Sequence, residues 1–504
     1  MQPVYLAETI RAAERPLLEA SPGLLMQRAA AGLAAVLLRE LRAVRGAVYG
    51  RRVLLAVGSG NNGGDALYAG VRLLGRGVRV RAWCTGSSLH EPAWAAFRAA
   101  GGGAVDAVGA VAELASADLV VDGVLGIGGR PGLRGPVALF ARACADAGVP
   151  VIAVDLPSGL DADSCAADDS RRPGERRDLG DASGGHVVST RSTNDEDSTG
   201  GGASHFTARL TVTFGGLKSC HVTEPAASAC GTVQLVDIGL TLPEPDLTAW
   251  QVVDVAAAWP FPDATSDKYS RGVVGIDTGS ERYPGAAVLG TLGAVHAGAG
   301  MVRFLGARRA EDLIRAQAPN VVMGDGRVQA RVLGSGWGDR PDGATVVAAA
   351  LEENRALVLD ADALRFLPGG ALGDQVLLTP HAGELARLLG IDRTDVTADP
   401  LHAVRRAAEQ LGATVLLKGA SQYVCGPDGA ITLAVPGPAW TAQAGSGDVL
   451  AGICGALLAA GLSPRRAALA GASVQALAAA AQPGPHPPQD GARALGAVIA
   501  ALRR

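Results

Sequence analysis

The five residues Ala444-Gly445-Ser446-Gly447-Asp448 have the types and spacing that phosphoryl chemistry needs. Two glycines around a serine leave consecutive backbone N–H groups free to bind one anion. The apolar residues 449–458 predict a helix whose positive end faces that anion. A carboxylate beside a phosphate repels it, unless the carboxylate exchanges a proton with a hydroxyl that meets the phosphoryl group. Asp448 is therefore either an acid–base group or simply an acidic helix cap.

A second glycine-rich run, residues 58–65 with the sequence GSGNNGGD, carries polar side chains that a plain turn does not need. The apolar residues 51–57 predict a buried strand before it, and residues 66–74 predict a helix after it. This order presents backbone N–H groups and a helix terminus to a phosphate, although the spacing differs from GxGxxG. Asn61 and Asn62 add side-chain oxygens that can ligate a hard cation or hold a ribose.

Aspartates end two further predicted strands of the first half, DLVVD at Asp122 and PVIAVD at Asp155. The carboxyl ends of parallel strands meet at one edge of the sheet, where ligands bind. We therefore expect Asn62, Asp122 and Ser158 to converge as oxygen ligands of a monovalent cation, with Asp155 facing the substrate. Loop capping is the alternative for either aspartate alone.

The second half repeats this arrangement, so we predict two parallel-sheet α/β domains in tandem. Apolar strands that begin near residues 356, 375 and 414 each lead into polar or glycine residues, including His381 and Lys418. On its own, His381 is more typical of a helix cap or of the surface than of a catalytic group.

Lysine is rare in this chain, because the 45 basic residues include only Lys218, Lys268 and Lys418. A compact ammonium and a planar guanidinium are not interchangeable at a binding site. The three lysines therefore either mark positions where a compact ammonium is needed or occur there by chance. Lys218 follows the predicted strand 205–214. There it either neutralises a phosphate or a carboxylate of the cleft, or lies in a solvated loop.

The length of 504 residues exceeds what one hydrophobic core organises and indicates at least two domains. We place a first domain at residues 1–240, a proline-spaced linker at 241–262 and a second domain at 263–504. Residues 162–204 interrupt the first domain with charged and glycine-rich sequence, which predicts a disordered insertion.

Composition excludes several classes of function. A net charge of -4 and a pI near 6.1 provide no basic field for nucleic acid or an anionic membrane. No apolar run approaches the roughly 20 residues of a membrane span, and the N-terminus has no secretory pattern, so we expect a cytoplasmic protein. The seven scattered cysteines indicate reduced thiols, with neither a disulfide framework nor a zinc site.

The motifs of both halves, taken together, resemble the bacterial bifunctional NAD(P)H-hydrate repair enzymes. In the first half they are GSGNNGGD, VDGVLGIG and VDLPSGLD, and in the second DKYSRGVVG, YPGAA, LDADAL, LTPHAGE, LLKGAS and AGSGDVLAG. The resemblance spans nearly the whole chain apart from the insertion. It implies a Rossmann-like NAD(P)HX epimerase domain fused to a ribokinase-like, ADP-dependent dehydratase domain, each with three αβα layers.

For the epimerase, the resemblance implies that Asp155 is the acid–base group for epimerisation at C6 of the hydrated nicotinamide ring. It implies K⁺ ligation by Asn62, Asp122 and Ser158. The implied contacts to the hydrate are Asn61, Asn62, Gly63, Gly64, Asp65, Gly126, Ile127, Gly128, Gly129, Arg130, Pro131, Gly132 and Asp155.

For the dehydratase, the resemblance implies that Asp448 activates the C6 hydroxyl of (S)-NAD(P)HX, while the glycine run and Mg²⁺ hold the phosphoryl group. Phosphorylation turns a poor leaving group into a good one. The implied hydrate contacts are Ala286, Gly336, His381 and Asp448, and the implied ADP or AMP contacts are Lys418, Gly419, Ala420, Ser421, Gln422 and Gly447.

The chain departs from the family pattern at two places. Ser446 stands where threonine is commoner, and Ser219-Cys220 follow Lys218 where the family more often has Pro-Gly. The expected partners are NADHX or NADPHX and ADP, in a homo-oligomer. One alternative is an ATP-dependent kinase of a vitamin precursor, which leaves the first half unexplained. Another is a non-enzymatic scaffold role for the first domain, which does not explain its polar cleft.

Overall fold

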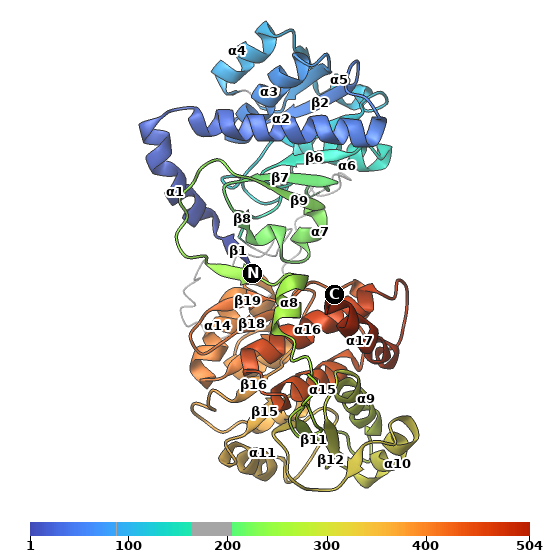
Figure 1. The fold of residues 1–504 in the computed structure, drawn as a ribbon. Helices are drawn as coiled ribbons and strands as arrows, with labels where there is room; N and C mark the ends of the chain where they lie inside the picture. The colour runs from blue at the N-terminus through green and yellow to red at the C-terminus, as the bar shows by residue number, and fades with distance from the viewer. Residues whose placement is uncertain (87, 164–203, 504) are drawn as a thin grey trace, which may run out of the picture. The chain divides into compact units, whose positions relative to one another are not determined.

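The computed structural model describes residues 1–86, 88–163 and 204–503. The chain forms two compact units, one made of Tyr5–Glu244 and the other of Met1–Val4 with Pro245–Arg504 (Figure 1). We call them the N-terminal unit and the C-terminal unit. The predicted insertion at 162–204 lies almost entirely outside the described residues.

The N-terminal unit contains a seven-stranded sheet in the order β4-β3-β2-β5-β6-β7-β9, and every neighbouring pair of strands is parallel. Its elements are α1 (Ala7–Ala20), α2 (Leu24–Arg45), β2 (Arg52–Val57), α3 (Asn61–Leu74), β3 (Arg79–Cys84), α4 (Glu91–Ala99), β4 (Gly103–Val105), α5 (Ala107–Glu113), β5 (Leu119–Gly123), α6 (Gly135–Ala147), β6 (Val151–Val154), β7 (Leu210–Phe214), β8 (Leu217–Lys218), η1 (Ser219–His221), α7 (Ala226–Cys230) and β9 (Thr232–Val236).

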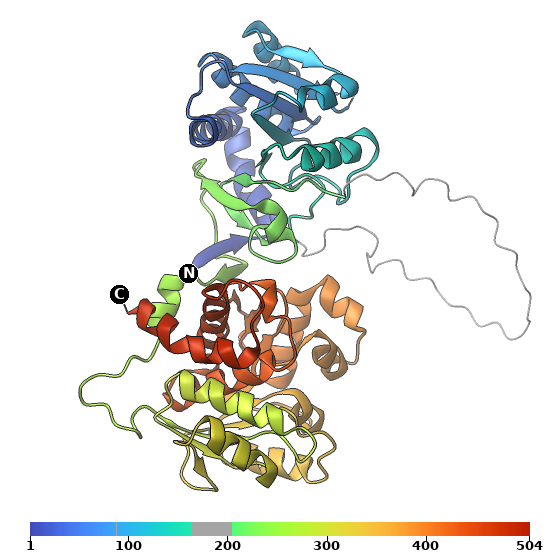
Figure 2. The ribbon, with the colours of Figure 1, turned by 90° about the vertical axis from the view of Figure 1, so that its right-hand side faces the viewer.

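Both faces of this sheet are buried, as the continuous apolar sequence of β2 predicts. Leu55 points into a core shared with α2, α3 and α4, whereas its neighbour Leu54 points into a second core shared with α5 and α6. Successive side chains of a strand point to opposite faces of the sheet, so each strand contributes to both cores. The sheet and the helices on its two faces form three αβα layers (Figure 2).

The C-terminal unit is built on a longer sheet, in the order β13-β12-β11-β14-β15-β16-β17-β18-β19-β10-β1. Its strands from β13 to β17 are parallel, and β18 runs antiparallel to both neighbours. Its elements are β1 (Gln2–Tyr5), β10 (Leu247–Ala249), α8 (Val252–Ala258), β11 (Val273–Asp277), α9 (Pro284–His296), β12 (Met301–Phe304), α10 (Arg308–Gln317), β13 (Val322–Met323), β14 (Ala330–Leu333), α11 (Gly343–Glu352), β15 (Ala356–Leu359), η2 (Ala361–Phe366), β16 (Val376–Leu378), α12 (Ala382–Leu389), α13 (Arg393–Ala398), α14 (Pro400–Leu411), β17 (Thr414–Leu417), β18 (Tyr423–Cys425), β19 (Ile431–Leu433), η3 (Ala439–Thr441), α15 (Ser446–Ala459), α16 (Pro464–Ala480) and α17 (Pro488–Leu502).

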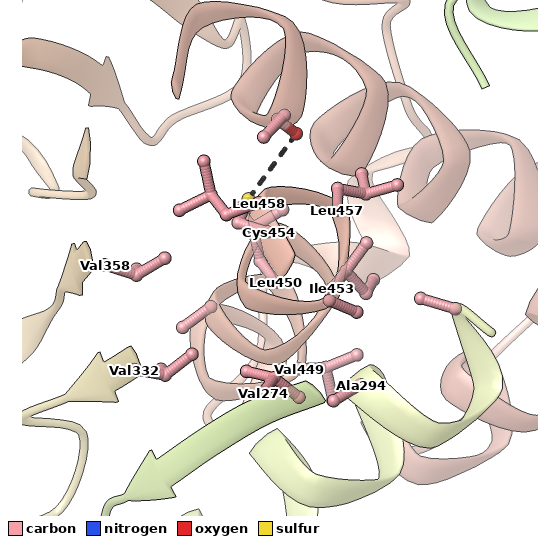
Figure 3. Packing of buried hydrophobic residues seen from close by; sticks show 14 of the residues in the cluster. Val274, Ala294, Val332, Val358, Val449, Leu450, Ile453, Cys454, Leu457 and Leu458 are labelled. Atoms are coloured by element: carbon pink, nitrogen blue, oxygen red, sulfur yellow. Dashed lines mark hydrogen bonds between the residues drawn. The ribbon is translucent and has the colours of Figure 1, made fainter. Parts of the chain in front are cut away.

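Helix α15, which follows the glycine run, lies at the centre of the C-terminal core (Figure 3). It is apolar on all sides because it packs against α9, α16 and the sheet at once. The thiol of Cys454 donates to the carbonyl oxygen of Ala467 in α16 at 3.8 Å. A Cβ at Gly452 would lie 1.9 Å from the carbonyl oxygen of Gly290 in α9, so glycine permits this close contact.

The structure differs from the sequence prediction at the predicted linker, 241–262. Within it, β10 pairs with β19 in parallel and with β1 in antiparallel orientation, and residues 252–258 form α8. Strands of three and four residues are too short to show a hydrophobic period, and their partners are remote in the sequence. A smaller difference is that α3 begins at Asn61, so that only the first residues of the glycine run form the turn.

No single helix in the described ranges has both the length and the apolar content of a membrane span. The bent pair α1 and α2 meets those two criteria only when its members are counted together.

Replacing Gly452 with alanine is expected to lower the free energy of unfolding of the C-terminal unit by roughly 1–3 kcal/mol, because α9 and α15 must move apart. Gly496→Ala in α17 is the matched control, since a Cβ there meets no atom within 4 Å. It is expected to be neutral or to stabilise by up to about 1 kcal/mol. Urea unfolding followed by tryptophan fluorescence measures both, and equal midpoints for the two variants would contradict the packing account.

Candidate functional sites

The cavity of the N-terminal unit lies where its strand order reverses. The chain runs from β2 to β3 and β4 on one side and then returns to β5 on the other, and α3 after β2 packs on the opposite face of the sheet from α6 after β5. A cavity of about 1160 Å³ opens there. Its lining includes the predicted residues Asn61, Asn62, Asp65, Gly126, Ile127, Gly128, Gly129 and Asp155. The predicted contacts Gly63, Gly64, Arg130, Pro131 and Gly132 are not among its lining residues.

Two glycines of the glycine-rich run 58–65 are required by backbone packing. A Cβ at Gly58 would lie 1.8 Å from the carbonyl oxygen of Val124, and a Cβ at Gly63 would lie 2.2 Å from that of Gly58. These close approaches draw the β2 loop, the β5 loop and the first turn of α3 together. They explain the two glycines without any ligand.

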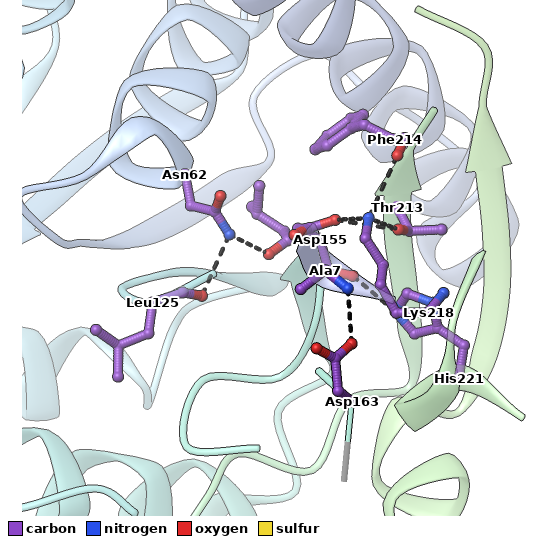
Figure 4. Close-up of polar contacts among 10 residues, drawn as sticks. Ala7, Asn62, Leu125, Asp155, Asp163, Thr213, Phe214, Lys218 and His221 are labelled. Carbon is purple, nitrogen blue, oxygen red and sulfur yellow. Dashed lines mark hydrogen bonds and ion pairs between the residues drawn. The ribbon is translucent and has the colours of Figure 1, made fainter. Parts of the chain in front are cut away.

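Asp155 is the centre of a buried polar network (Figure 4). Its Oδ1 atom lies 2.5 Å from the ammonium of Lys218, which also donates to Thr213 Oγ1 at 2.8 Å and to the carbonyl oxygen of Phe214 at 3.3 Å. Lys218 is only 1% exposed. Burial alone would raise the pKa of Asp155, but the charge and hydrogen bond of Lys218, with help from His221 and Thr213, lower it below its usual value.

The backbone of Asp155 has φ of 71°, a left-handed conformation that is uncommon for a residue with a side chain. His221 holds it in place. Its Nε2 atom lies 2.8 Å from the carbonyl oxygen of Asp155, and its Nδ1 atom accepts from the backbone N–H of Lys218 at 3.0 Å. One imidazole therefore positions both members of the ion pair.

Lys218 corrects one of the sequence alternatives. The solvated-loop interpretation is wrong, and neutralisation of a cleft carboxylate is what the structure shows. Sequence reasoning gave no role to His221. Its neighbours Cys220 and Cys230 are buried with it, and the ligand atoms of the three lie within 4.8 Å of one another. Both imidazole nitrogens are already engaged with Lys218 and Asp155, which leaves no free nitrogen for a metal.

The three predicted cation ligands meet below the cavity. Ser158 Oγ donates to Asp122 Oδ1 at 2.6 Å, and the backbone N–H of Ser158 donates to Asp122 Oδ2 at 2.7 Å. The carbonyl oxygen of Leu125 lies 3.2 Å from both Ser158 Oγ and Asn62 Nδ2. Burial raises the pKa of Asp122 to about 6, although hydrogen bonds from Ser158 and Val124 oppose the shift. Carboxylate, hydroxyl and carbonyl oxygens are donors that a hard cation requires. Asn62 turns its amide nitrogen toward the carbonyl oxygens of Leu125 and Val154.

The C-terminal unit has a matching arrangement at the ends of β14 to β17. Asp360, at the end of β15, accepts from Ser335 Oγ at 2.7 Å, from Thr379 Oγ1 at 2.8 Å and from the ammonium of Lys418 at 2.6 Å. Sequence analysis identified Lys418 but gave Asp360 no role. The strand-end position of Asp360 was the available signal.

Asp448 lies in the first turn of α15, whose N-cap is Gly445 with φ of 91°. In the described part of the chain no side chain caps this helix, so the interpretation of Asp448 as a cap is wrong. Burial and then the charge of Asp360 raise the pKa of Asp448 to about 6, partly offset by Lys418. Burial alone would lower the pKa of Lys418, yet the surrounding carboxylates, Asp360 first, raise it.

The remaining predicted residues occupy the same edge of the sheet. A Cβ at Gly336 would meet the Cβ of Ala286 at 2.5 Å, and a Cβ at Gly447 would lie 3.2 Å from the ammonium of Lys418. His381 forms a β-bridge with Lys418, while its Nδ1 atom caps α12. After Lys418, the residues Gly419 and Ala420 are exposed and Ser421 is buried. The Oε1 atom of Gln422 is buried and lacks a hydrogen-bond partner among the described residues.

Known proteins resemble both halves of the chain. Residues 274–496 match the family described as NAD(P)H-hydrate dehydratase, and residues 23–220 match the family described as YjeF-related protein N-terminus. The bifunctional NAD(P)H-hydrate repair enzyme Nnr of Mycobacterium leprae is 44% identical over 502 residues, covering 96% of each chain. That of Mycobacterium tuberculosis H37Rv is 44% identical over 480 residues, covering 93% of this chain and 91% of the relative.

The chain belongs to the bifunctional NAD(P)H-hydrate repair enzyme family. Membership confirms the resemblance drawn from the motifs. The similarity to these relatives extends over the first half of the chain, which the alternative of a vitamin-precursor kinase leaves unexplained. Among solved structures, the ADP/ATP-dependent NAD(P)H-hydrate dehydratase of Bacillus subtilis is 26% identical, with a TM-score of 0.48. It covers 51% of this chain and 99% of its own.

Replacing Asp448 with asparagine is expected to stabilise the protein above about pH 6. The folded pKa of about 6 exceeds the ordinary value of 3.8, so this carboxyl group stabilises the fold below pH 3.8 and loses that contribution as the pH rises through 6. An amide does not ionise, so the Tm of the variant should exceed that of the wild type at about pH 8 and approach it at about pH 4. Asp312→Asn, at a side chain that is 90% exposed, is the control. A lower Tm of Asp448→Asn at alkaline pH would contradict this assignment.

Proposed function

We propose that this chain repairs hydrated NADH and NADPH in two steps. The N-terminal domain, residues 1–240, interconverts (R)- and (S)-NAD(P)HX. The C-terminal domain, residues 263–504, dehydrates (S)-NAD(P)HX at the expense of ADP, giving AMP and phosphate. The observation that carries this proposal is the 44% identity to repair enzymes over both halves of the chain.

In the epimerase domain, the cavity beside Asp155 holds the hydrated nicotinamide ring. Asp155 stays ionised because Lys218 is bonded to it, so its carboxylate is available as a proton acceptor beside the ring. Asn61–Asp65 and Gly126–Gly132 bind the remainder of the nucleotide. Asp122, Ser158 and Asn62, the last after rotation of its amide, would hold K⁺, which would supply a fixed positive charge beside the cavity.

In the dehydratase domain, Asp448 takes the proton of the C6 hydroxyl as that oxygen attacks the terminal phosphoryl group of ADP. Its pKa of about 6 suits a base that works near neutrality. The backbone N–H groups at the start of α15 and the ammonium of Lys418 stabilise the phosphoryl charge. The C6–O bond then breaks as phosphate leaves, and loss of the C5 proton restores the dihydronicotinamide.

The other predicted contacts of the dehydratase complete this arrangement. Gly447 and residues 418–422 bind the adenine nucleotide, and the unpartnered Oε1 atom of Gln422 supports this assignment. Ala286, Gly336 and His381 bind the hydrate with Asp448. The carboxylate-rich strand ends would hold Mg²⁺, which would neutralise charge on the transferring phosphoryl group. The protein acts in the cytoplasm as a homo-oligomer.

Replacing Asp155 or Asp448 singly with asparagine is expected to separate the two activities. Asp448→Asn should lower the rate of (S)-NADHX dehydration by more than about 10²-fold and leave epimerisation intact, because only the C-terminal base is lost. Asp155→Asn should do the reverse. Recovery of reduced-nicotinamide absorbance measures dehydration, and chromatography of the two hydrates measures epimerisation. Each variant's unaffected activity serves as its folding control. Loss of both activities in one folded variant would defeat the two-site assignment.

Removing K⁺ is expected to slow epimerisation specifically. Protein dialysed free of K⁺ should regain epimerase activity in a saturable way as K⁺ is added, and Asp122→Asn should weaken that response because a charged ligand is lost. Asp146→Asn, an exposed substitution on α6, should respond like the wild type. Equal epimerase rates with and without K⁺ would contradict the assignment of Asn62, Asp122 and Ser158.

A further inference from the structure

Asp65 places a buried, unpartnered carboxyl oxygen in the epimerase cavity, as far as the described residues show. It lies on α3 and lines the cavity, yet it is only 6% exposed. Its Oδ1 atom is buried and has no hydrogen-bond partner in the described part of the chain. A buried carboxylate without a partner is costly as an anion, and a structural one is normally bonded to backbone or side-chain donors. Packing therefore does not explain an aspartate at this position.

The charges around Asp65 favour its neutral form. Asp155 after β6 and Glu14 on α1 both act on it with negative charge, while the ammonium of Lys218 on β8 is bonded to Asp155. Burial raises the pKa of Asp65 well above its usual value, and the charges of Asp155 and Glu14 raise it further. Asp155, by contrast, is held ionised. Two carboxyl groups that their surroundings drive to opposite protonation states are the usual mark of an acid and a base in one site.

We propose that Asp65 is a second catalytic residue of the epimerase, which donates a proton to the C6 hydroxyl of the hydrate while Asp155 serves as the base. This inference rests on the proposed epimerase function and adds a residue role to it. The resemblance itself implied only that Asp65 contacts the hydrate.

The C6–O bond breaks with its electron pair going to oxygen, Asp65 protonates that oxygen, and water is released. The lone pair of ring N1 forms a double bond to C6 at the same time, so the ring becomes an iminium cation. Water then adds to C6 from the opposite face, the N1 lone pair is restored, and Asp155 accepts the proton that the water loses. Epimerisation in the reverse direction, or proton exchange with solvent, returns both groups to their starting states.

Asp65→Asn is the direct test, because asparagine keeps the shape and the polarity but has no proton to transfer. We expect the kcat of epimerisation to fall by about 10²–10⁴-fold, with KM changed by less than about threefold, since binding is retained. Dehydration of (S)-NADHX should be unchanged. The Tm should not fall, because the variant removes a buried group that lacks a partner. Asp146→Asn, exposed on α6, is the matched control and should leave both activities unchanged.

Three outcomes would overturn the assignment. One is an Asp65→Asn variant whose epimerase kcat stays within about threefold of the wild type. Another is a Glu14→Gln variant that loses epimerase kcat while Asp65→Asn keeps it, because the proton donor would then be Glu14. If Asp65→Asn unfolds, Asp65→Ala decides the question: recovery of kcat with added formate supports a proton-donating role, and no recovery overturns it. If the wild type itself does not epimerise the hydrates, the proposed function fails, whereas the outcomes above concern Asp65 alone.

Discussion

A buried ammonium–carboxylate pair at the end of a parallel sheet is the constraint on which each unit depends. Lys218 binds Asp155 in the N-terminal unit, and Lys418 binds Asp360 in the C-terminal unit. Removing such charges from water costs several kcal/mol per ion unless the partner and further hydrogen bonds are in place. A slip in strand register would therefore leave a bare charge in the interior. Two of the chain's three lysines serve in these pairs.

These pairs also set the protonation of their neighbours. Each site contains more carboxyl groups than its lysine can neutralise. In the N-terminal unit, Lys218 lowers the pKa of the Asp155 carboxyl group that is bonded to it. A second carboxyl group nearby, Asp65 in one unit and Asp448 in the other, has a raised pKa. Both proposed reactions move a proton on the C6 hydroxyl of the same ring. A carboxyl group with a raised pKa can carry the proton that such a step transfers.

Sequence analysis recovered the parts of the molecule that are encoded locally. The apolar strand β2, the glycine runs and helix α15 each follow from neighbouring residues, and the two tandem α/β units follow from their order. The short strands β1 and β10 were missed because their pairing depends on partners about 250 residues apart. Sequence analysis offered a cleft carboxylate as one partner of Lys218 but could not identify it as Asp155. The support from His221 and the role of Asp360 were missed for the same reason, since strand order brings these residues together. Motif resemblance named many cavity residues, but only the fold showed that Asp65 has a buried carboxyl oxygen without a partner among the described residues.

The central claim is that both sites act in sequence on one damaged coenzyme. It is tested most directly by giving the protein pure (R)-NADHX with ADP and Mg²⁺ and following reduced-nicotinamide absorbance. The account predicts full recovery of NADH after a lag that shortens as protein is added, because the (R) form must first be converted in the N-terminal unit. Recovery from (S)-NADHX alone, with (R)-NADHX left unchanged beyond its spontaneous rate, would contradict it.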